Sequence, residues 1–242
     1  MIDQKEMPFL DHLEELRWRS IKIITSVFIF TIGTFFISDL FLEFLLYPSK
    51  HVNANLDLQV LKVQTIFIIK LEIALIVGII ISIPVIFYQL WAFVAPGLLE
   101  KERKWVWPII IVILLSFLVG ASFAYFIIIP YALDFFLGLA PSSVRNNIAI
   151  DFYFGFILRI IIVFGIVFEL PVVSLFLTKI GLLTPIILRK YRKYAIITIF
   201  ILAAVLTPPD PTTQLFLGIP LVILYEFTIL ISYVFAKKRK EA

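Results

Sequence analysis

The chain has 242 residues, of which 62% are hydrophobic and 16% are charged, and its formal net charge is +4. A mean hydropathy of +1.06 excludes a soluble globular protein of this length and indicates a single integral membrane domain, residues 1–242, that crosses the bilayer several times. The absence of Cys excludes disulfides and thiolate chemistry, and so small a positive charge is ordinary for membrane flanks and does not indicate nucleic-acid binding.

The chain begins with a charged amphipathic segment, residues 1–20, rather than with a cleavable signal sequence. Asp11, Glu15 and Arg19 recur at every fourth residue and therefore share one face of a helix, opposite an apolar face. We expect this segment to lie at the membrane interface and to lead into the first span. The simplest role for Glu15 is a local ion pair with Arg19, which would contribute only about 0.3–0.5 kcal/mol.

Six apolar segments follow. At ~1.5 Å per residue, about 20 helical residues cross a hydrocarbon core of ~30 Å. The predicted spans are Ile21–Leu46, Thr65–Val94, Trp105–Leu137, Phe152–Ile180, Tyr194–Leu206 and Thr212–Phe235. The fifth is short, and the turn Thr207–Pro211 after it cannot continue a helix. This pair is either a short hairpin or a re-entrant loop, and the flanking charges favour the hairpin.

Prolines stand inside four of these segments. Each removes a backbone hydrogen bond and tends to bend a helix, which membrane proteins tolerate when neighbours satisfy the freed carbonyl. The predicted architecture is therefore an all-α bundle of six kinked helices with a concave face, although plain packing kinks are the simpler interpretation. The prolines are Pro84, Pro130, Pro171 and Pro220.

The basic residues predict an orientation. If the N-terminus is cytoplasmic, 16 of the 21 Lys and Arg residues fall on the cytoplasmic side. This bias places both termini in the cytoplasm. The acidic residues of the N-terminal segment and of the loop after the second span, which include Glu100 and Glu102, then lie on the same side, where they could bind a basic ligand.

Two acids lack an obvious local partner. Glu102 has Trp105 and Val106 at the positions three and four residues on, so no base lies in its helical register. Glu169 lies within the fourth span, where a carboxylate costs ~2.5–3.5 kcal/mol on insertion scales and is expected to face protein or water. The simpler interpretation is that Glu102 is a solvated loop acid and that Glu169 makes an internal hydrogen bond. We find no phosphate-binding loop, nucleophile–base pair or His-rich metal motif, so we expect neither an enzyme nor a cofactor or metal.

Several ordered motifs across the chain resemble the TatC family. They are Phe9-Leu-Asp-His-Leu-Glu-Glu-Leu-Arg17, Tyr88-Gln-Leu-Trp-Ala-Phe-Val-Ala-Pro-Gly-Leu-Leu-Glu-Lys-Glu-Arg103, Phe123-Ala-Tyr-Phe126, Phe168-Glu-Leu-Pro-Val172 and Leu206-Thr-Pro-Pro-Asp210. The resemblance implies six spans with both ends inside. It also implies that the chain is the receptor subunit of the twin-arginine protein translocase in the cell inner membrane, where it would bind the signal peptides of folded cargo. Transport would use the proton-motive force. The partners implied are the single-span subunits TatA and TatB, in a larger complex in which the chain also self-associates.

The resemblance also implies site residues. Glu15 and Glu102 match the positions that bind the signal peptide, and Glu14 stands beside Glu15 as the alternative acid. The neighbouring motif positions are Arg17, Phe93, Pro96 and Arg103. Glu169 matches an acid inside the membrane, and Pro48 and Asp210 match outer-face positions. A carboxylate can accept a planar guanidinium in bidentate fashion, which Lys cannot reproduce. One acid from the tail and one from the loop would thus bind two adjacent arginines.

Two other functions remain open from the sequence. A proton-coupled small-molecule transporter would use Glu169 and the bent spans. A structural scaffold would merely pair Glu15 and Glu102 with nearby bases.

Overall fold

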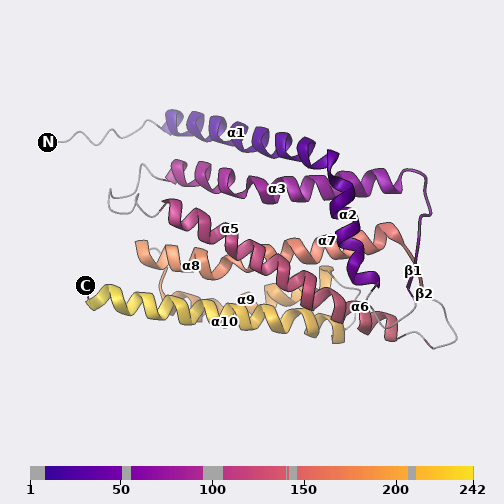
Figure 1. Ribbon diagram of the computed structural model, residues 1–242. Coiled ribbons are helices and arrows are strands. Elements are labelled where there is room, and N and C mark those ends of the chain that lie inside the picture. Colours follow the sequence, from indigo (N-terminus) through magenta and orange to yellow (C-terminus); the bar gives the residue numbers. More distant parts are fainter. Residues whose placement is uncertain are drawn as a thin grey trace. The chain divides into compact units, whose positions relative to one another are not determined.

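The computed structural model describes residues 9–50, 56–94, 106–139, 141, 146–181, 183–206 and 211–241. These residues are helical almost throughout, as predicted (Figure 1). Within these ranges, five stretches are long and apolar enough to cross a membrane: His12–Phe36, Thr65–Phe93, Trp107–Gly138, Ile150–Lys179 and Leu217–Ala236. The predicted short fifth span lies in helix α9 (Pro185–Leu206), whose first half is strongly basic, so the count of six spans stays a prediction.

The chain divides into two compact units. Unit 1 comprises Met1–Asp39 and Lys70–Ile111, and unit 2 comprises Leu40–Ile69 and Val112–Ala242. The single concave bundle stays a prediction.

In unit 1 the described part of the N-terminal amphipathic segment, from Phe9 on, forms one helix with the first span. Helix α1 (Phe9–Phe36) is continuous, and after a break at Ile37 a second helix, α2 (Ser38–Lys50), begins. The predicted bounds differ here, because the sequence suggested a separate interfacial segment and a span that continued to Leu46. Two polar residues, Ser38 and Asp39, follow Ile37 directly and begin α2, and apolar residues resume at Leu40.

Helices α1 and α3 (Thr65–Val94) pair antiparallel along the length of unit 1 (Figure 1). Their contacts progress in opposite chain directions, from His12 with Phe93, through Arg19 with Gln89 and Thr31 with Gly78, to Asp39 with Lys70. A Cβ on Gly78 would lie 2.7 Å from the backbone N of Thr31, so only glycine allows this approach. Small residues at such crossings let membrane helices pack closely.

Unit 2 contains most of a helix that has a π turn in its middle. Helix α5 (Val106–Phe123) continues through the π turn η2 (Ala124–Ile128) into α6 (Ile129–Gly138). The N–H of Ile129 donates to the carbonyl of Ala124, five residues back. Pro130 follows directly and has no N–H to donate, so the wider turn accommodates the residue that would disrupt a regular helix.

A second interruption separates α7 (Ile150–Val167) from α8 (Glu169–Ile180) at Phe168. Pro171 cannot donate to the carbonyl of Val167, so the helix is interrupted here. The hydroxyl of Ser116 in α5 donates to the carbonyl of Phe168 at 2.6 Å. Gly120 lies one turn further along α5, where a Cβ would come within 2.7 Å of the Phe164 carbonyl oxygen.

Helices α9 and α10 (Pro211–Glu241) complete unit 2 and lie side by side (Figure 1). Gly181 ends α8 in the left-handed conformation with φ of 84°, and the N–H of Ile187 donates to the Thr184 hydroxyl at 3.3 Å. This cap and Pro185 at the first helical position start α9 well before the predicted Tyr194.

Two short strands were not predicted. β1 (Leu56–Gln59) and β2 (Asn146–Ala149) pair in parallel, with Leu56 opposite Asn146 and Gln59 opposite Ala149. Four residues are too few for an alternating pattern to stand out from a loop.

Pro48 lies buried in α2, where it removes the donor that would bond the Phe44 carbonyl. The hydroxyl of Tyr125 donates to that carbonyl at 2.5 Å. One residue on, the hydroxyl of Tyr153 donates to the Leu45 carbonyl at 2.9 Å and accepts from the Ser49 N–H at 3.2 Å. Two tyrosines from other helices therefore satisfy the part of α2 that Pro48 disrupts.

Candidate functional site

The centre of the candidate site in unit 1 is the carboxylate of Glu15. Its Oε1 accepts from Nε of Arg19 at 2.9 Å and also contacts Nη2 of the same guanidinium. Nη1 of Arg19 donates to Oε1 of Gln89 in α3 at 3.3 Å. The ion pair that the sequence suggested is therefore present, and the amide of a second helix extends it.

The other oxygen of Glu15 has a different environment. Oε2 is buried and accepts no hydrogen bond within the described part of the chain. Nδ1 of His12 lies 3.8 Å away from it. The His12 ring stacks on Phe93 at a centroid distance of 4.3 Å, which fixes its position against α3. Glu15 thus already binds one guanidinium through one oxygen, and its second oxygen has unused acceptor capacity.

Other predicted positions on α1 are placed differently. Glu14 and Arg17 are exposed and face away from the Glu15–Arg19 pair. Because a helix turns by about 100° per residue, the side chains of these two adjacent acids leave the helix in different directions. Of the two, Glu15 is the acid that lies with Arg19, His12 and Gln89.

Four predicted residues lie outside the described ranges: Glu102, Pro96, Arg103 and Asp210. A site that combines Glu15 with Glu102 therefore stays a prediction. Phe93, by contrast, is described and takes part in the His12 stack.

Glu169 lies at the start of α8 in unit 2, directly after the break at Phe168. Only 8% of the residue is exposed, and among the described residues neither carboxylate oxygen makes a hydrogen bond of normal geometry, although the Phe117 backbone is close. Buried polar atoms in native proteins almost always have a partner. Among the described residues of unit 2, the Glu169 carboxyl group therefore has unused acceptor capacity.

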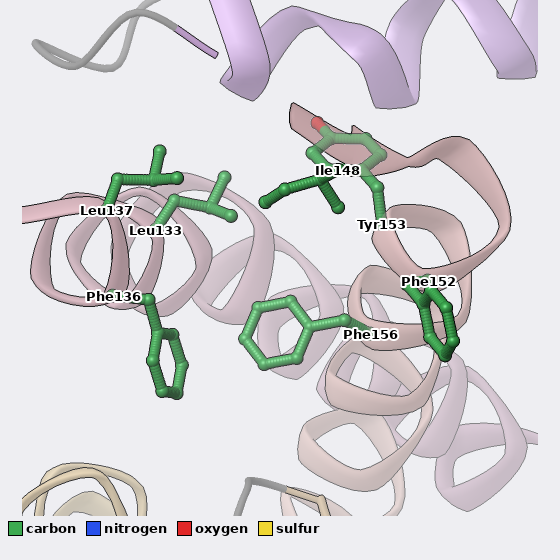
Figure 2. A pocket seen from close by; sticks show the side chains of 7 residues that line it. All are labelled: Leu133, Phe136, Leu137, Ile148, Phe152, Tyr153 and Phe156. Carbon is green, nitrogen blue, oxygen red and sulfur yellow. The ribbon is translucent and has the colours of Figure 1, made fainter. Parts of the chain in front are cut away.

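A cavity of about 160 Å³ lies between α6, β2 and α7 in unit 2, as Figure 2 shows. Phe136 and Phe156 meet edge to face across it at 5.9 Å. Tyr153 carries the single hydroxyl among the lining side chains, and this hydroxyl already makes hydrogen bonds to the backbone of α2. The cavity thus offers apolar surface rather than polar recognition; its lining is Leu133, Phe136, Leu137, Ile148, Phe152, Tyr153 and Phe156.

Comparison with known proteins identifies the family. The family model for Sec-independent protein translocase protein (TatC) matches residues 11–220. The chain belongs to the TatC family. It is 38% identical to the Sec-independent protein translocase protein TatCy of Bacillus subtilis (strain 168), covering 98% of this chain and 93% of that protein. It is also 38% identical to TatC of Aquifex aeolicus (strain VF5), covering 97% and 98%.

Solved structures give the same assignment. A crystal structure of the twin-arginine translocase receptor TatC superposes with a TM-score of 0.83 at 37% identity, covering 91% of this chain and 97% of that chain. A second crystal structure of this receptor, in DDM, superposes with a TM-score of 0.84, covering 91% of this chain and 99% of that chain. The all-α membrane fold and the TatC resemblance are thereby confirmed, and the chain is a multi-pass membrane protein of a protein-translocation family.

Sequence reasoning missed His12 and Gln89 as neighbours of Glu15 and Arg19 in this candidate site. His12 stands three residues before Glu15, a helical spacing that could have indicated it. Gln89 contacts Arg19 from 70 residues away along the chain, and a single sequence carries no signal for that pairing.

Proposed function

We propose that this TatC-family chain is the receptor of a twin-arginine translocase, and that Glu15 binds one arginine of the signal peptide while Glu102 binds the other. The observation that supports this is the Arg19 contact. In the free protein the Glu15 carboxylate already accepts a guanidinium, the group that a twin-arginine signal offers. Its second oxygen is unbonded within the described chain, so it can accept further N–H donors once neighbouring side chains move.

The proposal extends to the other motif residues. Arg17, Phe93, Pro96 and Arg103 would shape the binding region around the two acids, and Pro48 and Asp210 would stabilise the outer face. These assignments follow the family resemblance.

Glu169 has a proposed role of its own. Its buried carboxyl group would accept a polar side chain from a single-span TatA or TatB partner. The chain would lie in the cell inner membrane with both of its termini in the cytoplasm, as part of a larger assembly. Transport would use the proton-motive force, and this chain would not act as an enzyme.

The test is direct binding of a twin-arginine signal peptide to the purified full-length chain in detergent or nanodiscs. Glu15→Gln removes the charge but keeps the shape, so we expect roughly 10- to 100-fold weaker binding, the value of a charge-assisted hydrogen bond. The adjacent Glu14→Gln is the matched control and should change affinity less than twofold. Equal affinity for a peptide with two lysines in place of the arginines would contradict bidentate recognition of the guanidinium groups by the carboxylates.

Glu102→Gln tests the second carboxylate. The two variants should weaken binding separately, and the double variant should lose discrimination between arginine and lysine peptides. Undiminished, arginine-selective binding by the double variant would reject both roles.

A further inference from the structure

An exposed strip on α9 combines basic, aromatic and apolar residues in one line. Lys190, Tyr194, Ile197 and Ile201 follow helical spacings of four, three and four residues, so they share a face. All are exposed, with 55% of Tyr194 and 58% of Ile201 accessible. Lys193 borders the strip, and its Nζ lies 5.0 Å from the Tyr194 ring centroid. The strip is therefore basic and aromatic at one end and apolar along the rest.

The neighbouring bases are already engaged. Nε of Arg192 pairs with Oε1 of Glu226 in α10 at 2.6 Å, and the guanidinium of Arg189 lies 5.8 Å from the Tyr233 ring centroid. In the part of the chain that the structure describes, neither Lys190 nor Lys193 forms an ion pair with a carboxylate. Two ammonium groups without a carboxylate partner among the described residues therefore lie at the basic end of the strip.

The backbone that carries these lysines is held in place. The hydroxyl of Tyr225 in α10 donates to the Leu188 carbonyl at 2.9 Å, and at the far end of the helix Nε2 of Gln214 donates to the Phe200 carbonyl at 2.8 Å. Both hydrogen bonds join α9 to α10, and the strip residues stay exposed. A ligand on the strip would meet a surface that needs little ordering.

We propose that this strip binds an anionic phospholipid. The phosphate would lie between the ammonium groups of Lys190 and Lys193, Tyr194 would lie at the headgroup level, and an acyl chain would pack along Ile197 and Ile201. Lysines near the end of a membrane helix attract anionic lipid headgroups, and tyrosines concentrate at the same depth. Charge complementarity selects an anionic over a zwitterionic lipid, because the latter carries its own compensating ammonium group.

The experiment is a titration of the purified full-length chain with phosphatidylglycerol or with phosphatidylcholine of identical acyl chains, followed by native mass spectrometry. We expect tighter binding of phosphatidylglycerol. Each lysine contributes about fivefold, so Lys190→Gln with Lys193→Gln should weaken phosphatidylglycerol binding by roughly 30-fold and leave phosphatidylcholine unchanged. Lys190→Arg with Lys193→Arg should retain the preference.

The matched control is Lys22→Gln with Lys62→Gln, which makes the same charge change at exposed lysines elsewhere and should retain full affinity. Added NaCl should weaken phosphatidylglycerol binding to the unmodified chain, a measurement that requires no variant. Equal binding of the two lipids, or an unchanged phosphatidylglycerol affinity in the double Gln variant, would overturn the proposal. Loss of a co-purifying protein with lipid affinity unchanged would assign the strip to a protein partner and would equally overturn it.

Discussion

Arg19 and Glu15 form an ion pair one helical turn apart on α1, with Nε of Arg19 donating to Oε1 of Glu15 at 2.9 Å. Both side chains are about one-fifth exposed, so the pair is partly shielded from water. An internal arginine thus lies where we propose that an external one binds. This arrangement would lower the affinity for the signal peptide in exchange for a defined carboxylate position.

The first prediction concerns this competition. Arg19→Gln frees the Glu15 carboxylate, so we expect a twin-arginine peptide to bind about two- to fivefold more tightly, corresponding to an ion pair of about 0.5–1 kcal/mol. Peptide titration monitored by fluorescence anisotropy measures the change. Lys22→Gln removes one charge from an exposed position on the same helix and serves as the control. Weaker binding by Arg19→Gln would show that Arg19 orients Glu15 rather than competing for it.

The second prediction concerns the α1–α3 crossing. A Cβ at Gly78 would lie 2.7 Å and 2.9 Å from backbone atoms of Thr31, which cannot rotate away. We expect Gly78→Ala to destabilise unit 1 by about 1–3 kcal/mol, the usual cost of overpacking. Gly33→Ala is the matched control, because nothing lies within 4 Å of its added Cβ. The control should be neutral or stabilising, since alanine is the better helix former.

Thermal unfolding of the two glycine variants in one detergent provides the comparison. A Gly78→Ala protein as stable as Gly33→Ala would mean that the two helices can separate without cost.

The third prediction concerns the hydroxyl that compensates for Pro48. Tyr125→Phe leaves the Phe44 carbonyl without its 2.5 Å donor, so we expect a loss of about 1–3 kcal/mol. Pro48→Ala restores a backbone N–H at the position that normally bonds this carbonyl. In a Pro48→Ala background, Tyr125→Phe should therefore cost much less, and a double-mutant cycle should show the coupling. Additive effects would contradict this link between the two residues.

The fourth prediction separates stability from function at Glu169. Glu169→Leu replaces a buried, unbonded carboxyl group with an apolar side chain, so the purified chain should become about 1–3 kcal/mol more stable. Export and co-purification of single-span partners should nevertheless decrease, because the acceptor is lost. Glu169→Gln retains acceptor capacity and should keep part of both activities. Normal export by Glu169→Leu would reject the partner role.

The sequence determined the features that depend on local chemistry. Continuous apolar runs predicted the membrane helices, because backbone groups in hydrocarbon must be satisfied within the segment. The spacing of Glu15 and Arg19 predicted their pairing, since residues four apart share a helix face. Motif order predicted the TatC family. Pro130 and Pro171 marked helix interruptions, although their form, a π turn and a single-residue break, was not predicted.

The tertiary structure decided the features that depend on residues far apart in the chain. Gln89 and Phe93 reach the site from α3, where they contact Arg19 and His12. Tyr125 compensates for Pro48 from another helix, and Glu226 of α10 engages Arg192, the base that stands between Lys190 and Lys193 on α9. Pairings of this kind depend on the geometry of close packing between helices, whereas a linear pattern of polar and apolar residues specifies only which face of each helix is available.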